Sequence, residues 1–171
     1  MSILPIVTVP DPILRETSEP VERVDDDTRK LVADMLETMY DAPGLGLAAI
    51  QVGVPRRIVV ADVGVKEDRE ARAPICMINP EIIYRGQSMK SYEEGCLSLP
   101  DIHVEIDRPS DIRFRYVDTT GQQQERDASG LLATVVQHEV DHLDGRLIID
   151  FLSKLRRDMV VRKLKKTART A

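Results

Sequence analysis

Two histidines and one glutamate in a single short segment have the residue types and the spacing of a metal-dependent hydrolytic site. The stretch QHEVDH, residues 137–142, sets His138 and His142 four residues apart, with Glu139 next to the first. Residues four apart lie on the same face of a helix, so both imidazoles could bind one ion. Glu139, about 100° around the helix from His138, could approach a water on that ion. The alternative is that this short, easily matched pattern lies on a helix surface that binds no metal.

A catalytic zinc-type ion usually takes three protein ligands and keeps one position for water. The third ligand is not found downstream of His142. Some metalloproteases extend the motif to a third histidine, but Ile148 occupies that position here, and no glutamate follows Glu139 in the chain. If a metal binds, the spacing therefore predicts a ligand upstream.

Cys96, in the stretch EEGCLSLP, is the candidate for that ligand. We expect the two preceding glutamates to end a strand, Gly95 to relax the backbone, and Pro100 to prevent regular structure from continuing. A thiolate at such a strand end, together with two imidazoles, would make a Cys-His-His site with one open position. The alternative is a small buried hydrophobe, which is the interpretation that we favour for Cys76 in the apolar run PICMINP.

The segment PGLGLAAIQVG, residues 43–53, combines glycines with one isolated polar side chain. Gly44 and Gly46 would let the backbone come close to a ligand or to another part of the chain. Gln51 stands among small apolar residues, and its side-chain amide could donate a hydrogen bond to a developing oxyanion. The alternative is a buried, backbone-bonded glutamine after a glycine-rich turn. The segment lacks the spacing of a phosphate-binding loop.

Composition sets the class of protein. A length of 171 residues with 42% hydrophobic content is typical of one domain that buries a real core, so we expect a single domain over residues 1–171. No apolar run approaches the roughly 20 residues that span a bilayer, and the first ten residues lack the pattern of a secretory signal. We expect a cytoplasmic protein with no membrane association and, because only two cysteines are present, no disulfide.

The charge is unevenly distributed along the chain. The formal net charge is −5, yet the segment from Lys154 to Ala171 holds eight basic residues against the single acid Asp158. Such a basic C-terminal tail, at about residues 153–171, is typical of a segment that contacts an anionic partner. A solvated helix face would explain the same run of charges.

Hydrophobic periodicity and turn residues predict an α+β fold, in which antiparallel strands pack around a central metal-binding helix with one helix near each end of the chain. The first helix follows the acidic cluster at residues 25–27, carries Leu31, Met35 and Met39 on one side, and ends near Asp41. The other two helices are expected at about residues 129–144, ending at Gly145, and at 153–166. The last helix is expected to dock on the body through one apolar stripe of Leu152, Leu155 and Met159. Residues 64–74 are expected to form an exposed loop, and the strands are expected at residues 57–63, 77–85, 88–94, 103–107, 111–117 and 122–127.

Three stretches together resemble a known family. GLGLAAIQ, EGCLS and QHEVDH, in this order and at these separations, resemble the three signature motifs of the peptide deformylases, and the resemblance extends to about Asp150. It implies that Cys96, His138 and His142 hold one divalent metal, typically Fe(II), with nickel, cobalt or zinc as substitutes. It also implies a cytoplasmic hydrolase that removes the N-formyl group from the formyl-methionine terminus of nascent bacterial polypeptides and releases formate.

The resemblance implies a role for each matching residue. Glu139 would take a proton from the attacking water and later deliver one to the departing nitrogen. The oxyanion would be held by the side chain of Gln51, the backbone N–H of Leu97 and the metal. Leu45 and Gly95 would form backbone hydrogen bonds with the extended main chain of the substrate.

The family resemblance also implies a methionine pocket lined by Tyr92, Leu131 and Val135, with Gly44 and Gly46 in the substrate-binding segment. From the sequence alone, ordinary core residues would look identical. The implied substrates are formyl-methionyl nascent peptides. The basic tail would contact ribosomal RNA on the ribosome. The enzyme is expected to act as a monomer.

One residue departs from the family pattern, and two other functions share the helix motif. His103 departs from the residue types expected near the later substrate positions, and we interpret it as a histidine on a strand surface. Two rival functions share the helix motif: a zinc peptidase, which normally lacks a cysteine ligand, and an inactive metal-stabilised binding protein, which would be expected to lose Glu139 or Cys96. Both of these residues are present.

Overall fold

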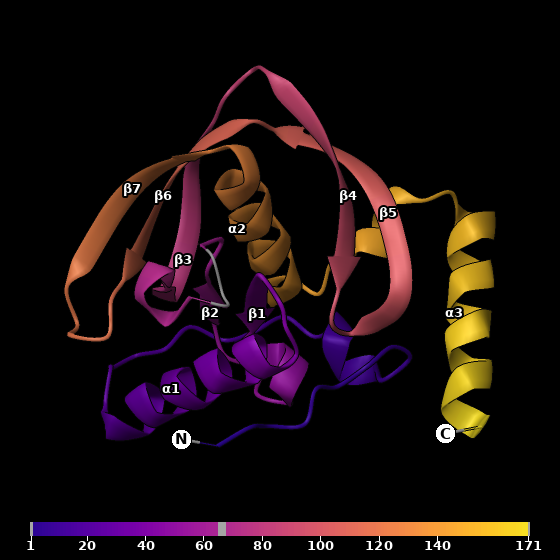
Figure 1. Ribbon diagram of the computed structural model, residues 1–171, viewed down its shortest axis with the longest axis horizontal. Helices are drawn as coiled ribbons and strands as arrows, with labels where there is room; N and C mark the ends of the chain where they lie inside the picture. The colour runs from indigo at the N-terminus through magenta and orange to yellow at the C-terminus, as the bar shows by residue number, and fades with distance from the viewer. Residues whose placement is uncertain (1, 65–67, 171) are drawn as a thin grey trace.

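The computed structural model describes residues 2–64 and 68–170, and its element order is that of an α+β protein (Figure 1). The helices are α1 (Asp26–Asp41), α2 (Gly130–Leu143) and α3 (Lys154–Thr170). The strands are β1 (Gly46–Ala48), β2 (Ile58–Ala61), β3 (Ile75–Arg85), β4 (Met89–Cys96), β5 (Leu99–Pro109), β6 (Asp111–Val117) and β7 (Gln123–Ser129). The predicted fold class is confirmed.

Two antiparallel sheets surround α2. One sheet has the strand order β1-β2-β3-β6-β7, and the other is the hairpin β4-β5. Figure 1 shows α2 between them, with α1 across one end and α3 beside β5 at the edge of the molecule. β1 lies at one edge of the larger sheet, and its first residue, Gly46, lies against α2.

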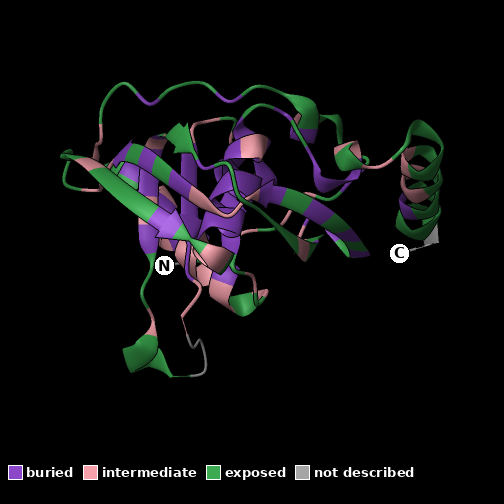
Figure 2. Ribbon diagram, turned by 90° about the horizontal axis from the view of Figure 1, so that it is seen from above, coloured by how far each residue is buried: buried purple, intermediate pink, exposed green. Residues whose placement is uncertain are grey.

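The central helix is buried because most of its sides face protein. Ala133, Val136 and Leu143 are fully buried and pack in one core with Ile50 and Phe114 from other elements. A helix that is apolar on nearly all sides belongs in the interior. Figure 2 shows that α2 is mostly buried, whereas α3 is mostly exposed. None of the helices in the described ranges is long and apolar enough to cross a membrane.

The helix boundaries follow the capping signals in the sequence. The side chain of Asp25 accepts a hydrogen bond from the backbone N–H of Thr28 at 2.8 Å and begins α1. Gly145 adopts a φ of +73°, and a Cβ there would lie 2.3 Å from the carbonyl oxygen of Arg15. Both the conformation and the close approach require glycine, which explains why α2 ends just before it.

The strand predictions are confirmed except at two places. β1 was not predicted, because a three-residue strand in a glycine-rich segment has no periodic signal. The expectation that Pro100 prevents regular structure is wrong, because Pro100 lies within β5. The register passes from the pair Gly95 and His103 to the pair Cys96 and Leu99, which leaves an irregularity at residues 100–102. An exposed proline is tolerated there, since proline occurs at strand edges and irregularities.

The C-terminal helix is present, but its predicted docking face is wrong. The sequence pattern placed Leu152, Leu155 and Met159 against the body. Leu155 and Met159 are 72% and 58% exposed, and only Leu152 is partly buried. The residues that pack against the body are Val160, Val161 and the buried Leu164.

The charged loop predicted at residues 64–74 is exposed where the structure describes it. Asp68 begins a short 3-10 helix (Arg69–Ala71) by accepting a hydrogen bond from the N–H of Glu70. Residues 65–67 of that prediction lie outside the described residues.

Candidate active site

Three potential metal ligands meet where β4 ends beside α2. Cys96 is the last residue of β4, and His138 and His142 lie one helical turn apart on α2. One ligand atom from each residue lies within 4.8 Å of the others, and Cys96 Sγ lies 3.4 Å from His142 Nε2. One thiolate and two imidazoles at this separation fit a transition-metal ion with an open position.

The two histidines are held differently. Nδ1 of His138 donates to Oε1 of Glu94 at 2.9 Å, because a carboxylate can only accept. This bond leaves Nε2 of His138 free to act as a ligand. Within the described residues, Nδ1 of the buried His142 has no hydrogen-bond partner. Packing and the contact of its Nε2 with Cys96 Sγ therefore orient the second imidazole.

The protonation states of the two imidazoles also differ. Burial, aided by neighbouring positive charge at His138, holds the pKa of His142 well below its usual range, so this ring is neutral and ready to bind a metal. Burial also lowers the pKa of His138, but contacts with Cys96 and Glu94 outweigh it and raise the pKa well above the usual range. Metal binding is therefore expected to release a proton.

A buried arginine supports the His138 side of the site. Arg108 Nε and Nη2 donate to the two carboxylate oxygens of Glu94 at 2.7 and 3.1 Å, and Nη1 donates to Asp141 at 2.9 Å. Burial alone would raise the pKa of Glu94, but the bonds from His138 and Arg108 lower it below its usual value. Arg108 thus ties β4 to α2.

This network of Arg108, Glu94 and Asp141 was not predicted from the sequence. The inward-facing positions of β5 are Ile102, Val104, Ile106 and Arg108. A charged residue that continues the buried alternation of a strand is a signal that could have found it, because a buried charge needs a partner. The identity of the partner depends on the β4–β5 register, which the sequence does not reveal.

Glu139 is a buried carboxylate without a strong partner. It is 4% exposed, and its Oε2 has no hydrogen-bond partner within the described residues. Its Oε1 lies 3.8 Å from Nε2 of His138, beyond hydrogen-bonding distance. Burial raises the pKa of Glu139 to about 7, while the charge of His138 opposes the rise. A carboxyl group with such a pKa can exchange a proton near neutral pH.

Gln51 combines both interpretations that the sequence left open. It is fully buried, and its Oε1 accepts a hydrogen bond from the backbone N–H of Ala48 at 2.9 Å. This bond fixes the amide so that Nε2 points to Ser98 Oγ at 3.1 Å and to Cys96 Sγ at 3.5 Å. The donor end of the amide therefore lies at the candidate metal site.

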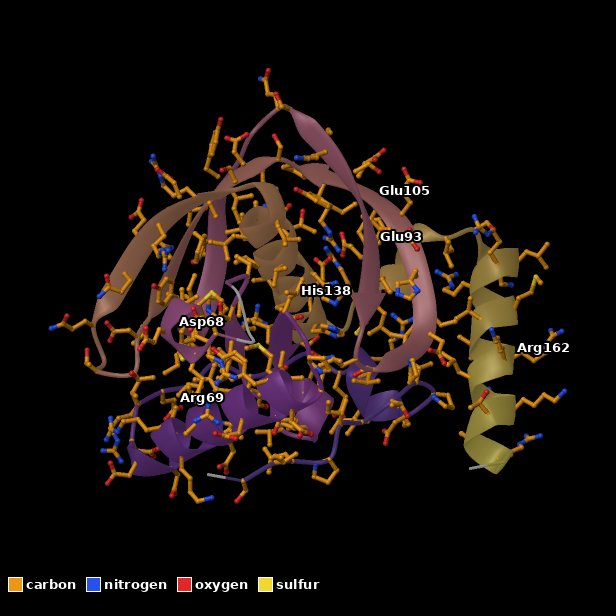
Figure 3. The ribbon with its side chains drawn as sticks, viewed as in Figure 1. Asp68, Arg69, Glu93, Glu105, His138 and Arg162 are labelled. Carbon is orange, nitrogen blue, oxygen red and sulfur yellow. The ribbon has the colours of Figure 1, made fainter. Side chains whose placement is uncertain are left out.

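A cleft with a volume of about 600 Å³ opens over these groups. Leu97, Glu139 and His138 lie in its wall, together with the residues of the predicted pocket and glycine-rich segment: Gly44, Leu45, Gly46, Tyr92, Gly95, Leu131 and Val135. Figure 3 places His138 on α2 in the middle of the molecule. Every predicted site residue other than the deeper Gln51 and His142 thus lines one cleft, and those two lie behind it beside Cys96.

His103 lies on the exposed face of β5 and is the cross-strand partner of Gly95. A Cβ at Gly95 would lie 3.2 Å from Cδ2 of the His103 ring, so the ring packs over this glycine. The interpretation of His103 as a strand-surface residue agrees with its exposure, and it also lines the outer part of the cleft.

Comparison with known proteins places this site in a family. A family model described as polypeptide deformylase matches residues 3–158. The peptide deformylase of Mesorhizobium japonicum is 57% identical over 169 residues, covering 99% of this chain and 95% of the relative. That of Rhizobium meliloti is 53% identical over 170 residues, covering 99% and 97%.

Solved structures show the same relationship. Peptide deformylase from Ehrlichia chaffeensis in complex with actinonin has a TM-score of 0.91 and 46% identity and covers 98% of each chain. The enzyme from Thermotoga maritima has a TM-score of 0.83 and 42% identity, covering 90% of this chain and 99% of that one.

The fold and the cleft define a metal-dependent hydrolase that acts on an amide bond. The chain belongs to the peptide deformylase family, whose reaction is the removal of the N-formyl group from nascent peptides. The zinc-peptidase and inactive-protein alternatives are therefore set aside.

Proposed function

We propose that Cys96, His138 and His142 hold one divalent ion and that the cleft above them binds the formylated terminus of a nascent chain. The carrying observation is that three ligand atoms within 4.8 Å of one another lie beside a buried carboxylate with a free oxygen. When bound, such an ion supplies Lewis-acid activation of water and of the formyl carbonyl.

In this proposal Glu139 handles the protons. The oxygen of a water molecule attacks the formyl carbon, and Glu139 accepts the proton that the water loses. The bond between the formyl carbon and the amide nitrogen then breaks, and Glu139 returns the proton to the departing nitrogen. The products are a free amine and formic acid, which loses its proton to solvent to give formate. A pKa of about 7 suits a group that must accept and donate a proton in one cycle.

We assign the oxyanion to two donors of the chain, Gln51 Nε2 and the backbone N–H of Leu97. The support for Gln51 is its orientation, because the bond between its Oε1 and Ala48 holds the amide nitrogen toward Cys96. Donors fixed before the reaction stabilise developing charge without the cost of reorganisation.

The substrate main chain is proposed to lie between the two sheets. β1 is an edge strand of the larger sheet, and among the described strands β4 pairs with β5 alone. An extended peptide could therefore add to both free edges. The carbonyl of Leu45 already accepts a hydrogen bond from Asp62 at 2.9 Å, so we assign its N–H, with the backbone of Gly95, to the substrate. The methionine side chain would contact Tyr92, Leu131 and Val135.

Formate release tests this function. The nickel-loaded protein should release formate from a formyl-Met tripeptide and leave the acetyl-Met tripeptide unchanged. Glu139→Ala should keep its metal and lose about 10²- to 10⁴-fold in kcat, the usual contribution of a general acid-base group. If the metal-loaded Glu139→Ala protein turned over at the normal rate, the assigned role would be wrong.

For the native metal we propose Fe(II), with nickel, cobalt and zinc as substitutes. A thiolate ligand beside a redox-active ion in an open cleft is exposed to oxidation. Protein purified without oxygen should contain iron, and its activity should decay in aerated buffer, while the nickel-loaded protein remains active. Equal lifetimes of the two forms would exclude iron as the working metal.

We propose that α3 contacts the ribosome. Its apolar residues Leu155 and Met159 are exposed, and basic residues flank them, Arg162 among those labelled in Figure 3. Phosphate attraction by such a surface is salt-dependent. A Lys163→Glu/Lys166→Glu variant keeps the buried Leu164. It should hydrolyse a short formyl-Met peptide normally but sediment less with ribosomes at low salt. Equal sedimentation at every salt concentration would mean that the tail only solubilises the protein.

We also propose that residues 1–171 work as one catalytic domain, as a monomer, in the cytoplasm. The support is that the proposed ligands, proton carrier and oxyanion donors all come from one chain. Light scattering during size-exclusion chromatography should give the mass of one 19.2 kDa chain. A stable dimer would contradict this part of the proposal.

A further inference from the structure

Gly46 lies in β1 directly against Glu139. A Cβ built at position 46 would lie 2.8 Å from Cγ of Glu139 and 2.9 Å from its Oε1. It would also lie 3.0 Å from Cγ1 of Val135, one helical turn earlier on α2. Real Cβ atoms essentially never approach other heavy atoms more closely than 3.0 Å, so an alanine at position 46 would force the Glu139 side chain to move.

The backbone does not explain the glycine at this position. The glycines with positive φ in the described residues are Gly53, Gly121, Gly130 and Gly145, and Gly46 is not among them. Gly46 is also paired in the sheet with Ala61, where any residue could supply the backbone hydrogen bonds. The missing side chain is therefore the feature that matters, and the space it leaves is filled by Glu139.

Among the described residues, the same carboxylate has only a weak polar restraint, the charge contact with His138. Its Oε2 has no hydrogen-bond partner in the described part of the chain, and its Oε1 is 3.8 Å from His138 Nε2. A buried side chain without hydrogen bonds is placed by the atoms that surround it. On one side these are the backbone of Gly46, and Val135 closes the adjacent side.

We infer that Gly46 is a positioning residue for Glu139: the absence of a Cβ forms a slot whose shape holds the carboxylate at the metal site. This inference rests on the proposed role of Glu139 and adds to it a cause for its placement. It also gives Gly46 a different role from the substrate contact that the family resemblance implies. A displacement of about 1 Å at a catalytic group can cost on the order of 100-fold in rate.

The activity test uses Gly46→Ala in the nickel-loaded enzyme. We expect kcat for a formyl-Met tripeptide to fall about 100-fold, with the nickel content unchanged and KM changed much less. Gly121→Asn is the control, because Gly121 has open space around it and lies outside the cleft. Its φ of +89° strains a side chain, and asparagine is among the residues that enter the positive-φ region most often. The control should keep its normal kcat. An unchanged kcat in Gly46→Ala would overturn the inference.

A second test does not depend on activity or on metal. The melting temperature of the metal-free protein is measured for Gly46→Ala in three backgrounds: wild type, Glu139→Gln and Glu139→Ala. Glutamine has the same shape as glutamate, so the alanine should lower the melting temperature by on the order of 5 °C in the first two. With Glu139 truncated to alanine the slot is empty, so most of this loss should disappear.

The outcomes separate the two proposals. If Gly46→Ala lowers the melting temperature equally in all three backgrounds, or fails to fold even with Glu139→Ala, the clash is not with Glu139 and the slot is rejected. If the thermal pattern holds but Glu139→Ala keeps full activity, the slot exists and the proposed catalytic role of Glu139 fails instead.

Discussion

The helices α2 and α3 are similar in length, but the fold uses them in opposite ways. α2 is enclosed by two sheets, and ten of its residues are buried, including both histidines and Glu139. α3 stands at the edge of the molecule and buries Leu164, while Leu155 and Met159 face outward. Enclosure fixes the direction of each side chain on α2. A helix held along one edge leaves its outer face free for a partner.

The difference extends to how charge is handled. On α2 the polar groups lie in a low-dielectric interior, where an unpaired charge is costly and pairs must be matched. Arg108 supplies that match through Glu94 and Asp141. On α3 the basic side chains are exposed to solvent, where ion pairs contribute little to stability. Substitutions should therefore have large effects around α2 and small ones along α3.

The largest expected effect is the loss of a metal ligand. Cys96→Ala removes the only thiolate from the site, so the protein should bind nickel poorly and release formate at the background rate. Cys76→Ala is the matched control, because burial raises the pKa of the Cys76 thiol to about 11 and keeps it an uncharged packing group. It should lose on the order of 1 kcal/mol of stability and keep its metal. Full nickel occupancy in Cys96→Ala would refute the three-ligand site.

The next effect concerns the buried arginine. Arg108→Met leaves His138 as the one remaining described partner of the buried, charged Glu94, which should lower the free energy of unfolding by up to about 3–5 kcal/mol and weaken nickel binding by about 10- to 100-fold. Arg115→Met removes a comparable two-bond contact with Glu81, but on an exposed surface. It should cost less than about 1 kcal/mol. Urea unfolding of the metal-free proteins measures both, and equal losses would contradict the contrast drawn here.

Features set by local helical geometry could be predicted from the sequence, whereas features set by contacts between distant segments could not. The proximity of His138 and His142, with Glu139 beside them, could be predicted from spacing, because a helix brings residues four apart onto one face. The Glu94 and Arg108 pair could not, since it depends on a strand register and on the approach of β5 to α2. The same limit applies to Gly46, whose contact with Glu139 joins segments far apart in the chain.

The docking face of α3 was predicted wrongly for a different reason. Leu155 and Met159 form one apolar row at helical spacing, and Val160, Val161 and Leu164 form another. Either row satisfies the periodicity. Which of them meets the body depends on the path of the preceding 3-10 helix, η4 (Ile148–Phe151), whose buried Ile148 and Ile149 join the same core as Leu164. Periodicity contains no information about that path.

Two substitutions on α3 compare its buried face with its exposed face, and their expected effects on stability are of intermediate size. Leu164→Ala removes a buried side chain and should cost about 2–3 kcal/mol of stability. Leu155→Ala removes an exposed one and should change stability by less than about 0.5 kcal/mol. Both should leave kcat for a short formyl-Met peptide unchanged, because α3 contributes no residue to the cleft. Thermal unfolding distinguishes the two faces, and the reverse order would restore the docking face predicted from the sequence.

The last prediction concerns the shape of the pH profile of the reaction. Glu139 must be deprotonated to accept a proton, and burial raises its pKa to about 7 in the metal-free protein. A bound cation favours the charged carboxylate, so the pKa in the loaded enzyme should lie below this value. We therefore expect kcat/KM to be constant above neutral pH and to fall about tenfold per pH unit on the acidic side. Leu155→Ala on α3 should reproduce this profile, whereas Glu139→Ala should lose the acidic limb because the group that titrates is gone. A limb that persists unchanged in Glu139→Ala would assign the titration to another group and leave Glu139 without a role in proton transfer.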